Sequence, residues 1–481
     1  MSANMVSWRD YEGVEGFGAS DQADVDNLNK ALRAGQDINA PGSFTAGDGF
    51  ALRVESLEKT LKNLTYRMEH IVLWKNITKL AAYNTIEEHN EISSYSDNPD
   101  GNWIDEGDLP NEQSATLARR YAVIKYIGAT RRVSYQMTLI KPAHGNVIAQ
   151  ETVNGTMDIL RAAERAMFYG NSALSALQFD GFEKMLTDRA PVANIIDLRG
   201  KPLSEDILTD AALTIQDAPN YGTPTDLFVN PKVKSDLCKA FFPKERYDLF
   251  SKPDNGMIGL DIKGFTSPAG DVRFQSDVFI TDGGAPNALA TGDAAKRPGT
   301  PTVSTGPTTP SDALSKFIAE DAGDYFYRIV ACNRYGRSAP VHLVAGPTAV
   351  TVAAGDKTTF AMTPGGATAV EWYEIYRSKV GGAALSDRLI LRVPNAAGAG
   401  AQTIDDYNNN LPYCTSGFLF QQNLESMSVK QLAPLVKIPL ATIDTSIRWA
   451  QLLFFTPVLY APGKNVLLRN IGRAVNFVGQ P

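Results

Sequence analysis

The ionisable side chains of this chain are distributed most unevenly between residues 80 and 150, where their sign changes abruptly. Residues 80–112 contain nine carboxylates and no lysine or arginine, whereas residues 113–150 contain six basic side chains and no carboxylate. Like charges at this density repel one another within a Debye length of about 8 Å. Pairing of the acidic segment with the basic segment would relieve this repulsion. These side chains are therefore suited to binding one another, within one chain or between chains.

Two interpretations of this charge inversion remain open. In the first, the segment is a solvated hairpin whose charges are scattered by chance. In the second, acidic and basic segments of different subunits clasp one another, and Arg131 and Arg132 meet Asp105 and Glu106 or the following helix of a neighbour. The candidate interface residues are Glu87, Glu88, Glu91, Asp105, Glu106, Asp108, Arg119, Arg120, Lys125, Arg131 and Arg132.

Catalysis, a metal site and a cofactor find little support in the sequence. The four histidines do not fall at metal-ligand spacing, and the sequence lacks the H-E-x-x-H, G-x-S-x-G and P-loop motifs. Glu87 and Glu88 are adjacent in a predicted strand, so their side chains point apart rather than forming a catalytic pair. We therefore expect no enzyme activity, no metal and no cofactor.

The elements that would position the charges are a ribbon and a long helix. Residues 117–126 alternate in the manner of a strand, and both faces of that strand are part apolar and part basic. Asn146 is a candidate N-cap for a helix that ends near Tyr169, before Gly170 and Asn171. Its apolar stripe is predicted to consist of Val153, Met157, Leu160 and Met167, with Arg161 and Glu164 on the polar side. Gly155 lowers helix propensity, so tertiary packing is expected to hold that turn.

The next elements have clear boundary signals. Ser204 is predicted to cap a helix whose first turn carries Glu205 and Asp206, and whose buried stripe is Leu208, Ala211, Ala212 and Ile215. Residues 226–229 are predicted to form a strand. A second helix is predicted to follow, with Asn230 as its cap and Pro231 in its first position.

The order of these elements resembles that of the tailed-phage major capsid proteins of the HK-ninety-seven fold. A W-x-x-E-G type segment, here Trp103 to Gly107, lies in a long loop that precedes the helix over 146–170. The resemblance covers residues 50–285 and implies an α+β capsid fold with an N-terminal arm, an extended loop (the E-loop), a long spine helix, and peripheral and axial domains.

A change in composition near residue 286 indicates a linker or domain boundary, followed by short alternating strands. Residues 324–341 resemble the F strand and following loop of fibronectin type III or immunoglobulin-like domains, and residues 371–378 resemble their C strand. These strands occur in the opposite chain order from that family. An inserted β-sandwich is therefore expected, with ordinary strands of the main domain as the alternative.

The resulting domain boundaries divide the chain into four parts. Residues 1–50 form the arm, residues 51–290 the capsid core, residues 291–415 the inserted domain, and residues 416–481 a return to the core. Within the core, the E-loop spans about 85–142, the spine helix about 146–170, and the peripheral and axial regions extend to 290. An amphipathic helix is also predicted over 57–71, from the spacing of Leu57, Leu61, Leu64, Met68 and Ile71.

Composition is compatible with a shell protein. The net charge of −7 argues against a dedicated nucleic-acid binder, and the three scattered cysteines suit a reducing cytoplasm. The start of the sequence lacks a signal-peptide pattern, and no membrane partner is expected. The resemblance implies a head shell of hexamers and pentamers in the virion, assembled in the host cytoplasm. Its expected partners are portal and scaffolding or decoration proteins, with packaged DNA in non-specific proximity. An encapsulin-like compartment and a glycan-binding adhesin are the alternatives.

Overall fold

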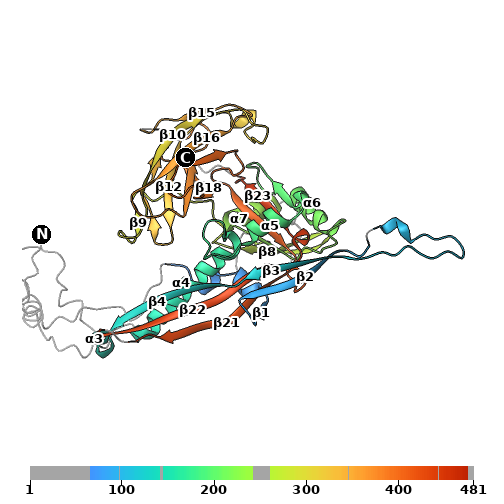
Figure 1. Cartoon of the computed structure of the whole chain (residues 1–481), viewed down its shortest axis with the longest axis horizontal. Helices are drawn as coiled ribbons and strands as arrows, with labels where there is room; N and C mark the ends of the chain where they lie inside the picture. The colour runs from blue at the N-terminus through green and yellow to red at the C-terminus, as the bar shows by residue number, and fades with distance from the viewer. Residues whose placement is uncertain are drawn as a thin grey trace, which may run out of the picture. The chain divides into compact units, whose positions relative to one another are not determined.

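The computed structural model describes residues 65–96, 98–140, 145–241, 261–344, 346–441 and 444–474 (Figure 1). Residues 64–140 and 147–481 belong to one compact unit. The predicted arm over 1–50 and most of the predicted helix over 57–71 lie outside the described residues. The described end of that helix contains only the 3-10 turn η3 (Met68–His70), and Ile71 directly after it is buried.

A mixed six-stranded sheet forms one half of the main body, in the order β5-β23-β20-β6-β8-β7. The β6–β8 and β23–β5 pairs are parallel, and the other pairs are antiparallel. Segments far apart in sequence therefore meet in this sheet. Its strands are β5 (Ile195–Asp197), β6 (Asp226–Val229), β7 (Gly264–Ser267), β8 (Gly270–Ser276), β20 (Thr415–Phe420) and β23 (Val466–Ile471).

A four-stranded sheet in the order β1-β21-β22-β4 forms the other half. Its strands are β1 (Lys79–Ala81), β4 (Lys125–Ser134), β21 (Met427–Pro439) and β22 (Ser446–Leu459). A separate two-stranded sheet pairs β2 (Ile86–Ser94) with β3 (Thr116–Val123). The ribbon predicted over 117–126 is therefore two strands with different partners. They are separated at Ile124, which is buried because it lies against the body at this change of partner.

Helices cover these sheets. The helices are α2 (Leu73–Asn76), α3 (Tyr135–Leu139), α4 (Val147–Tyr169), α5 (Phe182–Arg189), α6 (Glu205–Gln216) and α7 (Pro231–Phe241). Of these, α4, α6 and α7 begin where the sequence predicts, whereas α2, α3 and α5 are not predicted from the sequence. Short 3-10 turns are η4 (Pro99–Asn102), η5 (Val192–Asn194), η7 (Ala319–Asp321) and η8 (Pro462–Lys464). The Ser204 hydroxyl accepts from the backbone N–H of Ile207, and the four predicted core residues of α6 are all buried.

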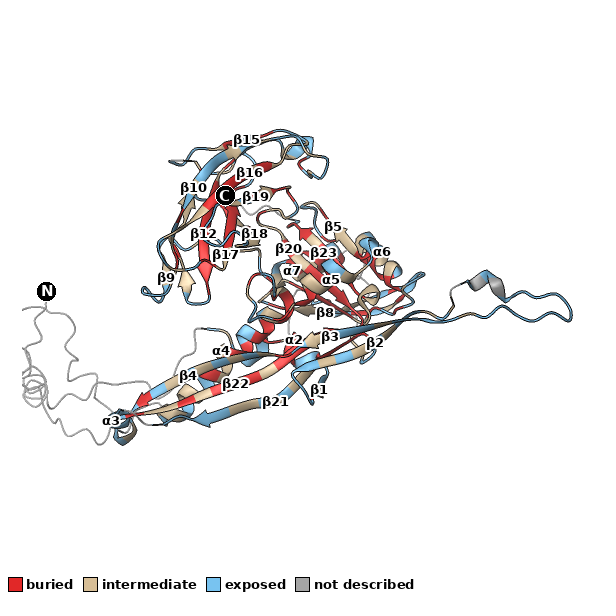
Figure 2. Cartoon of the chain, in the orientation of Figure 1, coloured by how far each residue is buried: buried red, intermediate tan, exposed pale blue. Residues whose placement is uncertain are grey.

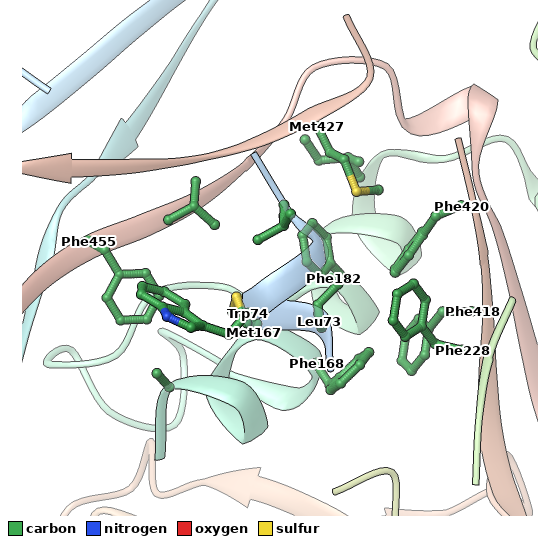
Figure 3. Packing of buried hydrophobic residues seen from close by; sticks show 14 of the residues in the cluster. Leu73, Trp74, Met167, Phe168, Phe182, Phe228, Phe418, Phe420, Met427 and Phe455 are labelled. Carbon is green, nitrogen blue, oxygen red and sulfur yellow. The ribbon is translucent and has the colours of Figure 1, made fainter. Parts of the chain in front are cut away.

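The main core lies between α4, α5 and strands of both body sheets (Figure 3). Phe168 of α4 packs against Phe418 with ring centroids 5.1 Å apart, and Phe182 of α5 packs against Phe420 at the same separation. Trp74 of α2 makes an edge-to-face contact with Phe455 of β22. Aromatic pairs of this kind add about 0.5–1.5 kcal/mol each beyond area burial.

Glu164 on α4 corrects one prediction, because it is fully buried rather than on the polar side. Its carboxylate accepts from the backbone N–H groups of residues 72, 73 and 74, at distances of 2.6–2.8 Å, and so satisfies the first turn of α2. Burial raises the pKa of Glu164, and hydrogen bonds from Asp277 and those three N–H groups oppose the rise. Val153, which the sequence predicts in the apolar stripe, is instead exposed. The buried residues of α4 begin only at Gly155.

Gly155 shows why α4 tolerates a glycine. A Cβ at this position would lie 1.8 Å from the Oε1 atom of Gln451, a residue of β22. The Gln451 side chain donates to the carbonyl oxygen of Thr152 at 2.9 Å and to the Thr156 hydroxyl at 3.2 Å. The glycine therefore allows close contact between helix and sheet, and this contact is the tertiary packing that the sequence predicts for that turn.

Residues 291–406 form further sheets with a core of their own. One sheet has the order β18-β17-β12-β13-β9, with β14 also paired to β12, and a second has the order β10-β16-β19. A two-stranded sheet pairs β11 with β15. The strands are β9 (Thr291–Gly292), β10 (Gly299–Thr308), β11 (Gly323–Tyr325), β12 (Tyr327–Asn333), β13 (Gly336–Arg337), β14 (Val341–His342), β15 (Val350–Val352), β16 (Thr358–Gly365), β17 (Trp372–Arg377), β18 (Arg388–Pro394) and β19 (Gln402–Asp406).

The segment predicted as a linker therefore contains β9 and β10. Its proline and threonine residues did not prevent pairing, because β10 joins β16 with several register shifts that accommodate the irregular strand. Side chains from both larger sheets fill one buried cluster, including Ile329, Phe360 and Tyr373. Every residue of β12 is buried, on both faces of the strand (Figure 2).

Candidate interaction surface

The β2–β3 hairpin, residues 86–123, carries most of the charges that the sequence singles out. Its strands are antiparallel, and the register pairs Ile86 with Val123 at the base and Ser94 with Thr116 toward the tip. Because side chains alternate along a strand, the hairpin has two different faces. We call them the inner face, where the residues are partly buried, and the outer face, where they are exposed.

The inner face is tied to the body of its own chain. Glu87 lies 3.6 Å from the Lys430 ammonium of β21, and Glu91 pairs with Arg189 of α5. Arg189 also donates to the carbonyl oxygen of Leu459 at 3.0 Å. The His89 ring contacts Tyr460 edge-to-face, with centroids 4.9 Å apart. These carboxylates therefore already have basic partners within one subunit.

The predicted basic residues of β3 also have partners within the hairpin. Arg119 pairs with Glu88, and the Arg120 Nε atom lies 3.3 Å from a carboxylate oxygen of Glu91. The acidic and basic segments thus meet across one strand pair. For these four residues the structure shows pairing inside a single chain.

The outer face carries five large apolar side chains together with the polar side chains of Glu88, Asn90 and Arg119. Its large apolar side chains are Ile86, Ile92, Leu117, Tyr121 and Val123. Leu117 is 66% exposed and Tyr121 is 73% exposed, although both are of types that are usually buried in sheets. Among the described residues nothing covers this face. A two-stranded sheet without an apolar partner is only marginally stable in water, so the outer face is a surface that needs a cover.

The loop at the end of the hairpin, residues 95–115, is exposed at most of its described positions, and Ser96 and Gln113 are half-buried (Figure 2). It contains the predicted residues Asp105, Glu106 and Asp108, which lie in a turn where the Asp108 N–H donates to the Asp105 carbonyl oxygen at 3.2 Å. Gly107 in this turn has a φ of +87°, which favours glycine. No ion pair joins these carboxylates to any described residue. Trp103, beside the turn, is 89% exposed.

The remaining predicted basic residues lie on β4 and have partners in their own chain. The Lys125 ammonium donates to the Ala176 carbonyl oxygen at 2.7 Å. Arg131 lies 3.4 Å from Asp158 and 3.9 Å from Glu151, both on α4, and Arg132 lies 3.7 Å from Asp444. The predicted contact of Arg131 and Arg132 with Asp105 and Glu106 lies between subunits and stays a prediction, whereas within the chain Arg131 and Arg132 contact α4 and Asp444.

Sequence reasoning on charge missed the outer face. Its signal was available as alternation, because apolar residues at 86 and 92 of β2 and at 117, 121 and 123 of β3 fall on one side of each strand. The register that places the five side chains on one face could not be read from the sequence. Neither could the direction of that face.

Other site chemistry finds no support in the described part of the chain. It contains no group of three or more His, Cys, Asp or Glu side chains that could hold a metal ion. None of its helices has the length and apolar character needed to cross a membrane.

Comparison with known proteins places the chain among shell proteins. The family model of the SU10 major capsid protein matches residues 30–295. The major capsid proteins of Staphylococcus phages S25-3 and K are each 24% identical over 459 residues, covering 93% of this chain and 95% of the relative. Among solved structures, the capsid of a native GTA particle aligns with 89% of this chain. The alignment includes 99% of the length of the GTA capsid chain. It is 11% identical and has a TM-score of 0.42.

Proposed function

The chain belongs to the SU10 major capsid protein family, and from this premise we propose that it self-assembles through the β2–β3 hairpin into the icosahedral head shell of a tailed phage. The family makes it a structural protein of the phage capsid. Its subunits would form hexamers and pentamers that enclose the genome. Family membership identifies the chain as a capsid protein. The proposed role of the hairpin follows from the geometry of this chain.

The observation that carries the proposal is the exposed outer face. Burying one Leu, Ile or Val side chain contributes about 1.5–3 kcal/mol. Five large apolar side chains on one face would therefore contribute several kcal/mol per subunit when a second copy covers them. The inner face is meanwhile tied to the body by Glu87 and Glu91, which directs the apolar face outward.

The predicted pairing of acidic with basic segments takes place partly within one chain. Residues Glu87, Glu88, Glu91, Arg119, Arg120, Lys125, Arg131 and Arg132 have partners within the chain, so we propose that they orient the hairpin and β4 for assembly. The carboxylates of Asp105, Glu106 and Asp108 have no such basic partner among the described residues. We propose that these three meet basic groups of a neighbouring subunit.

We further propose that residues 291–415 are an inserted immunoglobulin-like β-sandwich displayed on the outer surface of the shell. The support is their separate core and the order β17-β12-β13, which matches the C-F-G order of immunoglobulin sheets although the chain order differs. The flanking strands β8 and β20 both lie beside β6. An insertion between them leaves the six-stranded sheet intact.

We also propose roles for the two ends of the chain and for its partners. Residues 1–50 would drape over neighbours as an arm, and residues 416–481 would complete the capsid core. Portal and scaffolding or decoration proteins would be its partners, with assembly in the host cytoplasm. Packaged DNA would lie near the shell without specific binding, since a net charge of −7 does not favour a tight grip on a polyanion.

Assembly is tested by the size of the particles that the purified full chain forms, alone or with its scaffold. We expect megadalton shells, hexamers or pentamers in light scattering and negative-stain micrographs. Leu117→Asp should abolish them, because a carboxylate among these apolar side chains would lose its hydration when a second copy covers the face. A stable monomer of the unsubstituted chain at micromolar concentration would contradict the proposal.

Leu289→Asp is the matched control, since Leu289 is 78% exposed and lies outside the hairpin. It introduces the same charge at another exposed leucine and should leave shells unchanged. Equal loss of assembly in both variants would show that added charge, rather than the outer face, is responsible.

The inserted domain is tested by replacing residues 298–411 with a short Gly/Ser linker. The expected result is a shell of unchanged geometry, because the added length of a flexible loop costs little free energy. Loss of assembly with the rest of the chain soluble would show that these strands belong to the capsid core.

A further inference from the structure

A cleft rich in arginine lies between α4 and the sheet that contains β12, β17 and β18. It has a volume of about 670 Å³, and Arg161, Arg165, Arg337 and Arg392 all line it. Two carboxylates, Glu374 and Asp282, also line the cleft. The excess of basic groups therefore gives the cleft a net positive charge.

Most of these charged groups already have partners. Arg392 and Arg337 lie 3.1 and 3.2 Å from Glu374, which is nearly fully buried and also accepts from the Tyr376 hydroxyl at 2.8 Å. Burial alone would raise the pKa of Glu374, but the two arginines outweigh it and hold that pKa below its ordinary value. Glu374 is thus a fixed negative charge shared by two guanidinium groups.

Arg165 differs from its neighbours in the cleft. It forms no ion pair or hydrogen bond with another described residue, although it faces the charges of Arg392 and Arg337. Desolvation lowers the pKa of Arg165 and repulsion from Arg392 and Arg337 lowers it further, while the charge of Glu374 opposes the shift. Trp372 lines the same cleft, and its indole N–H has no acceptor among the described residues. The cleft therefore offers donors and positive charge to an anion that is missing from the single chain.

The hairpin tip carries carboxylates that form no ion pair with any residue that the structure describes. Asp105, Glu106 and Asp108 bring three carboxylates within four positions, in an exposed turn. No ion pair joins this turn to the cleft within one chain. The nine-residue strand β2 extends roughly 30 Å at about 3.4 Å per residue, so the hairpin can reach a neighbouring subunit.

We propose that the Asp105–Asp108 turn of one copy docks into the arginine cleft of a second copy, where its carboxylates pair with Arg165. A guanidinium binds a carboxylate through two parallel N–H donors, which fixes direction as well as charge. This inference rests on the proposed assembly through the hairpin and adds the partner site. Strands β13, β17 and β18 line the other side of the cleft, but the proposed partner Arg165 lies on α4 and is retained when residues 298–411 are replaced.

The direct test is cross-linking between two populations of full-length chains that are assembled together. One population carries Leu109→Cys, next to the turn, and the other carries Ala162→Cys, in the cleft, so the proposed partners stay intact and a short bismaleimide can join these two positions only between copies. We expect a covalent dimer at least ten times more abundant than that from a Leu109→Cys and Lys201→Cys mixture. Lys201 is an exposed basic residue outside the cleft. Shells that form but give no excess dimer would overturn the docking site and leave assembly through the hairpin standing.

A cryo-electron microscopy reconstruction of unsubstituted shells provides a second measurement that no substitution can disturb. The expected result is the 105–108 turn of one copy in the cleft of another, with a carboxylate at hydrogen-bond distance from Arg165. Nucleic-acid phosphate, residues 1–64, or solvent alone in that cleft would overturn the inference. Failure of the unsubstituted chain to form any shell would instead contradict the proposed function.

Discussion

The β2–β3 hairpin and the sheets of residues 291–406 are both antiparallel and rich in charged residues, yet they use charge differently. In the hairpin, pairs such as Glu88 with Arg119 are largely exposed to solvent. In the other region, Arg377 is fully buried and lies 2.6 Å from the equally enclosed Asp406. Exposed pairs contribute about 0–1 kcal/mol, whereas losing one partner of a buried pair costs about 3–5 kcal/mol.

This difference shows that the density of charge along a sequence is a poor guide to its energetic weight. The charge inversion over residues 80–150 is the most visible feature of the sequence, but most of it consists of surface pairs within one chain. Arg377 is the single basic residue of β17, so it does not attract notice in the sequence. Its side chain nevertheless binds Asp406, Asn408 and the carbonyl oxygen of Asn410. The hairpin lacks such a core, and we propose that contact with another copy adds to its stability.

The largest expected effect is that of Arg377→Met, which leaves the Asp406 carboxylate buried without its cation. We expect the free energy of unfolding of residues 291–406 to fall by about 3–5 kcal/mol. Native-state hydrogen exchange of β12 and β17 in the unassembled chain measures this loss. Arg334→Met, at an exposed arginine without an ion pair, should change it by less than about 0.5 kcal/mol. Equal effects of the two variants would remove the contrast between buried and exposed charge.

The body to which both regions attach provides the next test, through the buried pair Glu164 and Asp277. Burial raises the pKa of Asp277 to about 9, and the hydrogen bond and charge of Glu164 add to this rise. The nearby cation is Lys79, which interacts with Glu164. In an unfolded chain an aspartate loses its proton near pH 4. Between these values the folded state holds the extra proton, so stability falls as pH rises, by up to about 1.4 kcal/mol per pH unit.

Asp277→Asn should therefore flatten the dependence of the melting temperature on pH between 5 and 9. An asparagine amide can donate to Glu164 as the protonated acid does, and its oxygen can still accept from the Phe279 N–H, which lies 2.7 Å from Asp277 Oδ1. Calorimetry of the unassembled chain at pH 5, 7 and 9 measures the slopes. Parallel slopes for the variant and the unsubstituted chain would show that Asp277 does not hold the proton.

The smallest expected effect is that of Arg119→Ala in the hairpin. Its partner Glu88 is half exposed, so the lost pair should lower the stability of the isolated subunit by less than about 1 kcal/mol. Urea unfolding followed by circular dichroism measures this change. A loss above about 2 kcal/mol would mean that the surface ion pairs, rather than the apolar side chains of the outer face, dominate the stability of the hairpin.

Local signals predicted α6 and α7 well because their causes lie within a few residues. Ser204 caps its own helix, and Asn230 accepts from the N–H of Lys232 two positions later. The role of Glu164 was missed because its partners are residues 72–74, about ninety positions away. A side chain that caps a distant helix has no signature in the periodicity of its own helix, where it counts only as a polar residue.

The sequence placed most of the candidate interface residues in one hairpin, whereas their role in assembly stays a prediction. Its position followed from the charges, since Glu88 and Arg119 do lie in the hairpin. Which face is exposed could not follow, because both faces of β3 mix apolar and basic residues. The choice depends on contacts of Glu87 and Glu91 with Lys430 and Arg189, which lie far along the chain.

The central claim, that a second copy completes the hairpin, is tested most directly by hydrogen exchange in the unassembled chain and in assembled shells. The account predicts that the amides of β12 exchange slowly in both states, because that strand is buried within its own chain. The amides of β2 and β3 should exchange rapidly in the unassembled chain and become protected by at least tenfold in the shell. Equal protection of the hairpin in both states, or rapid exchange in the shell, would contradict the claim.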